Sequence, residues 1–345
     1  MPPLPLPFPP DGDETEAPEA GGEGPTDPGA GPGPADLGPV GHEPVLMRET
    51  LEALDVRPGQ TVVDCTLGRA GHAREITQRL GPEGLLVGTD VDPRNLEFAR
   101  ERLRDAPCRV RLFHANFAEL GEVLAEVGAK HVDGVLADLG LSTNQLFDPH
   151  YGLSFAQPMA LDMRIDPRLR RTAADLVNQT REDDLANVLY ELAQERYSRR
   201  ISKMIAAYRR ISPINTTDRL AELVRSAIPK RGGAPEKIDP ATRTFLALRI
   251  AVNREVENLA ALLEQAPRAL RPPTSSGGND PPRGGRLAVI SFQSTEDRRV
   301  KQAFRSAEQA GLLKVLTKKP LSPADDELAA NPRSRSAKLR AAERI

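Results

Sequence analysis

The feature that most constrains the fold is a strand, a glycine turn and a helix in direct succession, followed by a second strand. Residues 61–64 are a β-branched run that ends at an acid, and Gly68 and Gly71 follow it. Residues 72–80 have apolar positions at helical spacing, and residues 85–90 form a second apolar run that ends at another acid. This order is typical of the first half of a doubly wound α/β sheet.

The same stretch predicts a nucleoside-binding site. In such a sheet the loop after the first strand lies against the ligand, and an acid after the second strand binds ribose hydroxyls. We expect Asp90 to be this acid, because Asp92 stands before Pro93 and is explained as the cap of the next helix. No G-x-G-x-x-G or Walker loop occurs, so the leading candidate ligand is S-adenosylmethionine. A glycine turn alone does not decide this, since an αβ unit without a ligand also needs one.

Further alternation predicts a mostly parallel sheet that is interrupted by a helical insertion. Apolar runs predict strands at 110–113, 132–137 and 286–292, with a final pair at 312–316 and 337–342. A long helix is expected over 241–270, whereas residues 148–240 show helical patterning without a convincing strand. The expected organisation is a disordered acidic, Pro/Gly-rich tail (1–40), the first part of the α/β domain (41–147), an inserted helical substrate-recognition domain (148–240), and the second part (241–345) with a flexible loop (271–285).

Composition excludes several classes of protein. Two cysteines in 345 residues make neither a disulfide framework nor a zinc ligand set, so Cys65 and Cys108 are expected to be thiols in a reducing cytosol. No apolar run is long enough to span a membrane, and no signal peptide is evident, so we expect a cytoplasmic protein. The five histidines show no ligand spacing, and no metal site is expected.

The overall charge of −2 conceals an asymmetry that permits a nucleic-acid partner. Residues 1–40 contain acids but no Lys or Arg, so residues 41–345 carry a net positive charge. A basic run lies within the expected insertion at residues 195–210 and includes Arg199 and Arg200. It is either a solvated helix face or a surface that binds RNA phosphates.

Polar residues follow the predicted strands at their carboxyl ends, which meet at one edge of a parallel sheet. They are Asp64, Asp90, Asn116, Asp138 and the segment 291–294. Asp138 is placed either to accept a proton from an exocyclic base amine or to contact the cofactor. Phe292, beside Ser294, either stacks on a substrate base or packs at the strand end. Phe117 either flanks the adenine ring or begins the core contact of the next helix.

Together these segments resemble the bacterial small-subunit ribosomal RNA cytosine-N4 methyltransferases over almost all of residues 42–345. The similarity is carried by HEPVL (42–46), CTLGRAGH (65–72), DVDP (90–93), HANF (114–117), DGVLADLGLSTNQL (133–146), GLSF and LDMRID (152–166), ERYSRRI (195–201), PATRTFLALRI (240–250), SFQSTEDRRVK (291–301) and NPRSRSAKLRAAER (331–344).

The resemblance implies an α/β fold, the Rossmann-like class I methyltransferase fold with an inserted helical domain, and a cytosine in the decoding region as target. It implies cofactor contacts at Ala70, Gly71, His72, Asp90, Phe117, Asp138 and Gln145, and the position of Asp138 after the fourth strand makes it the candidate catalytic residue as well. Phe292, Ser294, Arg199 and Arg200 are the candidate substrate contacts. The resemblance also implies that the partner is small-subunit ribosomal RNA within the small ribosomal subunit. Ala70 replaces a usual glycine, and Gln293 and Thr295 replace a usual His and Leu.

Two alternatives remain open at this point. The Gln293 change motivates a non-catalytic ribosome-binding factor that keeps the methyltransferase fold. A DNA cytosine-N4 methyltransferase fits the base chemistry, but the catalytic tetrapeptide of two prolines and an aromatic residue is missing after the fourth strand. A dehydrogenase is disfavoured because the pyrophosphate fingerprint is absent.

Overall fold

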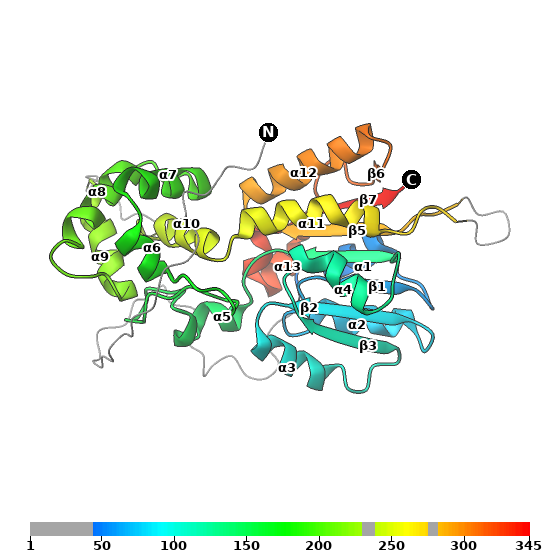
Figure 1. Ribbon diagram of the computed structural model, residues 1–345. Coiled ribbons are helices and arrows are strands. Elements are labelled where there is room, and N and C mark those ends of the chain that lie inside the picture. The colour runs from blue at the N-terminus through cyan, green and yellow to red at the C-terminus, as the bar shows by residue number, and fades with distance from the viewer. Residues whose placement is uncertain (1–43, 230–238, 275–281) are drawn as a thin grey trace. The chain divides into compact units, whose positions relative to one another are not determined.

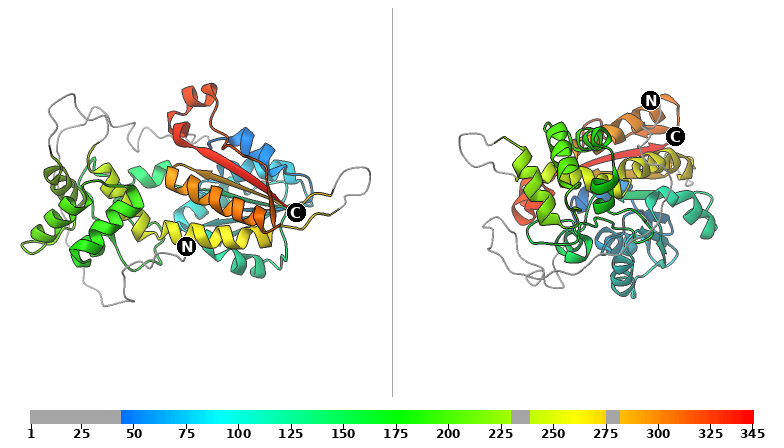
Figure 2. Two further views of the ribbon diagram at one scale, coloured as in Figure 1. Left: turned by 90° about the horizontal axis from the view of Figure 1, so that it is seen from above. Right: turned by 60° about the vertical axis from the view of Figure 1, so that its left-hand side comes forward.

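A seven-stranded sheet with strand order β3-β2-β1-β4-β5-β7-β6 organises the larger part of this computed structural model (Figures 1 and 2). The structure describes residues 44–229, 239–274 and 282–345. The predicted tail, residues 1–40, and the centre of the predicted loop 271–285 lie outside these residues. The described residues form two compact units, one from residues 44–142 with 256–345 and one from the described residues of 143–255. The domain boundaries inferred from sequence stay a prediction.

The sheet is doubly wound and mostly parallel, as predicted. Neighbouring strands from β3 to β5 pair in parallel, whereas β7 pairs antiparallel with both β5 and β6. The chain runs outward from β1 to β3 and then returns to place β4 on the other side of β1. In such a sheet, ligands bind at this reversal, beyond the carboxyl ends of the strands. The strands are β1 Thr61–Asp64, β2 Leu85–Asp90, β3 Arg109–His114, β4 Gly134–Asp138, β5 Arg286–Ser291, β6 Leu313–Val315 and β7 Lys338–Arg344.

Helices cover both faces of the sheet, and alternate strand residues point to opposite cores. Val62 belongs to one apolar cluster and Val63 to the other, as the two-residue period of a strand requires. Helices α1 Met47–Leu54, α2 Gly71–Leu80 and α3 Pro93–Arg102 contribute to the first core. Helices α4 Leu120–Glu126, α11 Glu255–Ala269 and α12 Ser294–Gln309 contribute to the second, and α11 and α12 lie side by side (Figures 1 and 2). The remaining short helices of this unit are η1 Phe117–Glu119, α13 Asp325–Ala330 and η3 Pro332–Ser336.

The second unit is helical, and α7 packs against both α8 and α10. Its core includes Leu189, Ile201 and Leu248, all fully buried. Within its described residues, paired strand geometry is limited to an isolated bridge between Ala160 and Thr216. Its helices are α5 Thr143–Phe147, η2 Pro149–Tyr151, α6 Ala173–Gln179, α7 Glu182–Ala193, α8 Ser198–Tyr208, α9 Thr217–Ala227 and α10 Thr242–Val252.

The prediction of one long helix over residues 241–270 is wrong. Helix α10 ends at Val252 and α11 begins at Glu255, and Arg254 between them has a left-handed φ of 52°. The break is fixed by Asn253, whose side-chain amide donates to the Met163 carbonyl oxygen (2.7 Å) and accepts from the Ile165 N–H (2.9 Å). Apolar residues continue at helical spacing on both sides, so periodicity alone does not reveal it.

Candidate functional site

The loop that follows β1 is tied to the acid that ends β2. One Asp90 carboxylate oxygen accepts from the Gly68 N–H (2.7 Å), and the other accepts from the Asp92 N–H (2.8 Å). Gly68 has a φ of +51°, which a glycine adopts without strain. Because each carboxylate oxygen can accept more than one hydrogen bond, Asp90 keeps capacity for ribose hydroxyls. Asp92 caps α3 by accepting from the Arg94 N–H (3.0 Å), which confirms its expected capping role.

The start of α2 is a tight turn with little room for side chains. Ala70 is fully buried and holds a φ of 59°, a left-handed conformation that destabilises an alanine by roughly 1–2 kcal/mol. A Cβ added at Gly71 would lie 2.7 Å from Pro44 Cγ, closer than carbon atoms can approach. Glycine is therefore required at position 71, whereas position 70 accepts alanine under strain.

Asp64 and Asp138 are held at the carboxyl ends of the adjacent strands β1 and β4 by a shared partner. The Thr66 N–H donates to Asp64 Oδ1 (3.1 Å), while the Asp138 N–H donates to Thr66 Oγ1 (2.6 Å). The Asp138 side chain is 25% exposed, yet its Oδ1 atom is buried and has no hydrogen-bond partner in the described part of the chain. An unsatisfied buried carboxylate oxygen of this kind is costly, and it points to a donor supplied by a ligand.

His72 faces Asp138 as a neutral hydrogen-bond acceptor. Its Nε2 lies 2.9 Å from the Val45 carbonyl oxygen, and since a carbonyl can only accept, Nε2 carries the hydrogen. Nδ1 therefore presents its lone pair, 3.8 Å from Asp138 Oδ2. Burial lowers the pKa of His72 to about 4, so the ring supplies no positive charge at neutral pH.

Three acids at this edge of the sheet lack a compensating cation. Burial, above all, raises the pKa of Asp64 to about 7, that of Asp90 to about 6 and that of Asp138 to about 8. The neighbouring charges of Asp64 and Glu296 add to the increase at Asp138. No Lys or Arg of the described segments forms an ion pair with these three acids. Such a site favours a cationic ligand, and a sulfonium nucleoside with ribose hydroxyls fits it.

The predicted aromatic residues follow the carboxyl ends of two strands, β3 and β5, which are separated by three strands in the sheet. Phe117 begins η1 and packs, partly buried, against the second core, which is the structural alternative considered for it. Phe292 follows β5 and is half-buried, and a Cβ added at Gly140 would lie 3.3 Å from its Cδ2 atom. Its N–H and that of Gln293 both donate to Glu296 Oε2 (3.1 Å each). Ser294 is the first residue of α12.

Sequence reasoning missed Thr66 and Glu296. Thr66 accepts a hydrogen bond from the backbone N–H of Asp138, 72 residues away, and no local sequence pattern predicts that contact. Glu296 had a visible signal, because an acid three residues after Gln293 is typical of a helix N-terminus. The Gln293 side chain donates to Glu296 Oε1 (3.0 Å), so this replacement of a usual histidine is accommodated within the first turn of α12.

The other predicted contacts belong to the helical unit. Gln145 lies on α5 and is 4% exposed. Arg199 is exposed on α8 and lies 3.1 Å from Asn187 Oδ1, and Arg200 beside it is also exposed. Arg209, from the same basic run, instead donates to the Val177 and Thr180 carbonyl oxygens (2.7 and 2.6 Å). The run therefore combines an internal structural arginine with exposed ones.

The doubly wound sheet with its antiparallel β7, together with acids at the ends of β1, β2 and β4, defines a Rossmann-like class I methyltransferase. The chain belongs to the MraW methylase family, whose model matches residues 39–345. The predicted fold class, family and cofactor, S-adenosylmethionine, are thereby confirmed.

Two relatives show how close the similarity is. The ribosomal RNA small subunit methyltransferase H of Geobacter sulfurreducens is 46% identical over 319 residues, which cover 88% of this chain and 99% of the relative. The protein of that name from Acidobacterium capsulatum is 45% identical over 311 residues, covering 88% and 98%. Among solved structures, an rRNA methylase from Streptococcus thermophilus aligns with 87% of this chain and 93% of its own at 11% identity and a TM-score of 0.36, too low to support an argument.

Two further properties concern the described residues alone. They contain no helix that is both long and apolar enough to cross a membrane. They also contain no group of three or more His, Cys, Asp or Glu side chains arranged to hold a metal ion. Cys65 is buried and Cys108 half-buried, and both are free thiols.

Proposed function

We propose that this protein transfers a methyl group from S-adenosylmethionine to N4 of a cytosine in the decoding region of small-subunit ribosomal RNA. The relatives' name supports ribosomal RNA of the small subunit as the substrate. The observation that carries the chemistry is the buried Oδ1 of Asp138 at the end of β4, to which none of the described residues donates a hydrogen bond. The substrate is RNA held within the small ribosomal subunit, and the reaction takes place in the cytoplasm.

Asp138 acts on the reacting amine. The N4 nitrogen of cytosine is a poor nucleophile because its lone pair is delocalised into the ring. When the N4–H group donates a hydrogen bond to Asp138 Oδ1, the lone pair of the N4 nitrogen becomes more localised on that atom. The same carboxylate oxygen accepts the N4 proton as the methyl group is transferred. The bound cofactor supplies an electrophilic methyl group on a positively charged sulfur.

The charge state of Asp138 is matched to this role. Without a ligand its pKa lies at about 8, because burial and two neighbouring carboxylates disfavour the anion. A cation within a few ångströms lowers a carboxyl pKa, so the loaded site presents Asp138 as the anionic acceptor that the reaction needs. His72 holds its Nδ1 lone pair 3.8 Å from Asp138 Oδ2 and keeps that side of the carboxyl group free of positive charge.

Other residues bind and orient the cofactor and the RNA substrate. Asp90 accepts hydrogen bonds from the ribose hydroxyls, and the turn from Gly68 to His72 passes close to the cofactor because positions 68, 70 and 71 are glycine or alanine. Phe117 lies beside the adenine. Phe292 stacks on the target cytosine next to Ser294, and stacking of a base on an aromatic ring contributes roughly 1–3 kcal/mol. Gln145 contacts the cofactor, while Arg199 and Arg200 bind RNA phosphates.

The test is methyl transfer from isotope-labelled S-adenosylmethionine to small ribosomal subunits that lack the modification, followed by nucleoside analysis. We expect labelled N4-methylcytosine with the wild-type protein and none with Asp138→Asn. Cofactor binding, measured by calorimetry, is followed in parallel. Wild-type protein that binds the cofactor but leaves cytosine unlabelled would overturn the proposed function in favour of a non-catalytic binding factor.

A further inference from the structure

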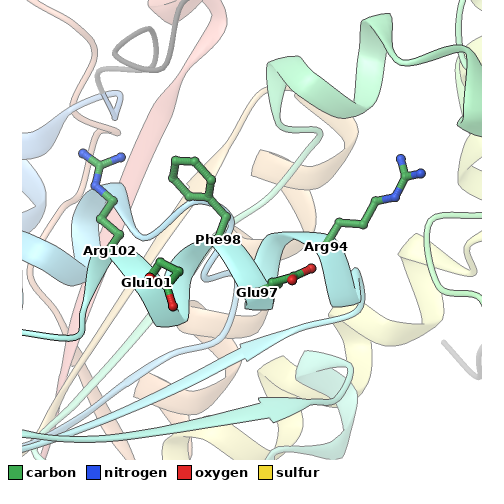
Figure 3. Close-up of a pocket in the computed structure, with 5 residues that line it drawn as sticks. All are labelled: Arg94, Glu97, Phe98, Glu101 and Arg102. Carbon is green, nitrogen blue, oxygen red and sulfur yellow. The ribbon is translucent and has the colours of Figure 1, made fainter.

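Helix α3 carries a stripe of arginine and phenylalanine on the outside of the catalytic unit. Arg94, Phe98 and Arg102 are spaced four residues apart, which places them one above the other on a single helix face, about 6 Å apart along its axis. Figure 3 shows the three side chains projecting from the same side of α3. With Glu97 and Glu101 they line a surface hollow of about 550 Å³. We call these three residues and Arg69, described next, the α3 stripe.

Arg69 joins this face from the loop after β1. Its guanidinium carbon lies 4.7 Å from the centre of the Phe98 ring, a cation–π contact. Arg102 in turn donates from Nη1 to the Arg69 carbonyl oxygen (3.3 Å). The phenyl ring is half-buried, although its neighbours at positions 94, 97, 101 and 102 are all exposed. Arginine and aromatic side chains so combined are typical of surfaces that bind single-stranded nucleic acid.

The net charge of this surface favours a polyanion. Three arginines face two glutamates, and Glu101 forms an ion pair with Arg104, outside the hollow. Arg69 and Arg102 then outnumber Glu97, which leaves an excess of positive charge around Phe98. Glu97 is the acidic group left in the hollow, and a carboxylate there accepts hydrogen bonds from base amines or ribose hydroxyls.

The stripe begins where the reaction takes place. Arg94 lies in the first turn of α3, capped by Asp92 and only four residues after Asp90. Arg69 follows Gly68, whose N–H is bound to the Asp90 carboxylate. The stripe thus runs from the edge that holds the three acids toward the opposite end of α3. A target base bound at that edge is still part of its RNA strand. The flanking nucleotides must therefore lie along the protein surface as they lead away from the site.

From these observations we infer that the α3 stripe binds the RNA strand that flanks the target cytosine. Arg94 and Arg102 contact phosphates on either side of a base that stacks on Phe98, which Arg69 supports. This inference rests on the proposed function for the identity of the RNA and adds a binding surface in the catalytic unit to the one proposed on α8.

The test uses the full chain and compares substitutions within one helix. Arg102→Glu and Phe98→Ala alter the stripe, whereas Arg100→Glu changes the same charge at an exposed position that does not line the hollow. Binding to a short fluorescein-labelled single-stranded RNA is followed by anisotropy over a range of salt concentrations. The KM for unmodified small subunits, kcat and cofactor affinity are measured for each protein.

We expect Arg102→Glu and Phe98→Ala to weaken RNA binding and raise KM by about fivefold or more, with kcat and cofactor affinity unchanged. Arg102→Glu also reduces the slope of log affinity against log salt by about 0.7, the loss of one phosphate contact. Arg100→Glu has a smaller effect on each quantity.

Three outcomes overturn the inference. The first is wild-type RNA affinity and KM in both stripe variants, and the second is an equal loss in the Arg100→Glu control. The third is a raised KM for subunits with unchanged binding of the labelled RNA, which would assign the stripe to a ribosomal protein. Failure of the wild-type protein to form N4-methylcytosine refutes the proposed function instead, and the RNA-binding measurements then still test the stripe.

Discussion

Replacing Asp138 by asparagine should stabilise the cofactor-free protein while abolishing turnover. The carboxyl group is partly exposed, but its buried Oδ1 has no hydrogen-bond partner among the described residues, and its pKa is raised to about 8. In the unfolded chain the pKa of an aspartate is about 3.9. Folding near neutral pH therefore requires this group to take up a proton that it lacks when unfolded. Asparagine has almost the same shape and needs no proton.

The size of the effect follows from proton linkage. Because the pKa of Asp138 is raised in the folded state, the folded protein binds more protons, and stability falls as pH rises from about 4 to about 8. The linkage is about 1.4 kcal/mol for each pH unit, so near neutral pH it reaches at most about 4 kcal/mol. Structural relaxation and water around the partly exposed side chain reduce this linkage energy. We therefore expect Asp138→Asn to raise the free energy of unfolding by about 1–4 kcal/mol.

The assay is urea-induced unfolding of the cofactor-free wild-type and Asp138→Asn proteins, followed by circular dichroism at several pH values. The gain should grow with pH across the acidic range and level off near the folded-state pKa of about 8. Asp105→Asn, at an exposed site, is the matched control and should show no pH-dependent gain. A variant that is no more stable than wild type at neutral pH, or a gain independent of pH, would refute the assignment of an uncompensated buried carboxyl to Asp138.

Four further outcomes are expected. Asp90→Ala should weaken cofactor binding by roughly 1–3 kcal/mol through lost hydrogen bonds, and an unchanged calorimetric affinity would reject the ribose role. Cofactor binding near neutral pH should release protons, because a cation lowers the raised pKa values of the three acids; equal heats in buffers of different ionisation enthalpy would contradict this. Charge reversal of Arg199 and Arg200 should weaken RNA binding and flatten its salt dependence, and an unaltered slope would leave them as a solvated face. Arg340→Met should destabilise the fold by about 3–5 kcal/mol in urea unfolding, because it removes the buried partner of Asp297, whose side chain is only 13% exposed, and a smaller loss would show that this carboxylate is hydrated instead.

Strands β1, β2, β4 and β5 were predictable from sequence because they are short apolar runs in the parallel part of a sheet that is covered on both faces. Such runs stand out when each ends at a polar residue, as β1 does at Asp64 and β4 does at Asp138. The same reasoning anticipated that Asp92 caps α3, since an acid before a proline at the first helical position is a local signal.

Features that depend on distant contacts were not predictable. The break after α10 is set by hydrogen bonds from Asn253 to residues 163 and 165, about ninety positions earlier in the chain. Likewise, the basic run on α8 gave no sign that Arg209 turns inward to two backbone carbonyls. Hydrophobic periodicity reports which face of an element is buried, but it does not report which polar group lies opposite.

The arrangement of acids at the carboxyl edge of the sheet indicates a ligand-binding site, because the free protein would be more stable if these acids were paired or fully hydrogen-bonded. A core that held Asp64, Asp90 and Asp138 only as structural elements would supply each with a cation or with enough donors. Here the backbone supplies donors to Asp64 and Asp90, while Asp138 Oδ1 receives none from the described residues. A cationic cofactor compensates the negative charge that the three acids share, whereas Asp138 Oδ1 needs a hydrogen-bond donor. The cytosine amine is such a donor. Cofactor and substrate therefore supply two different interactions that the free site lacks.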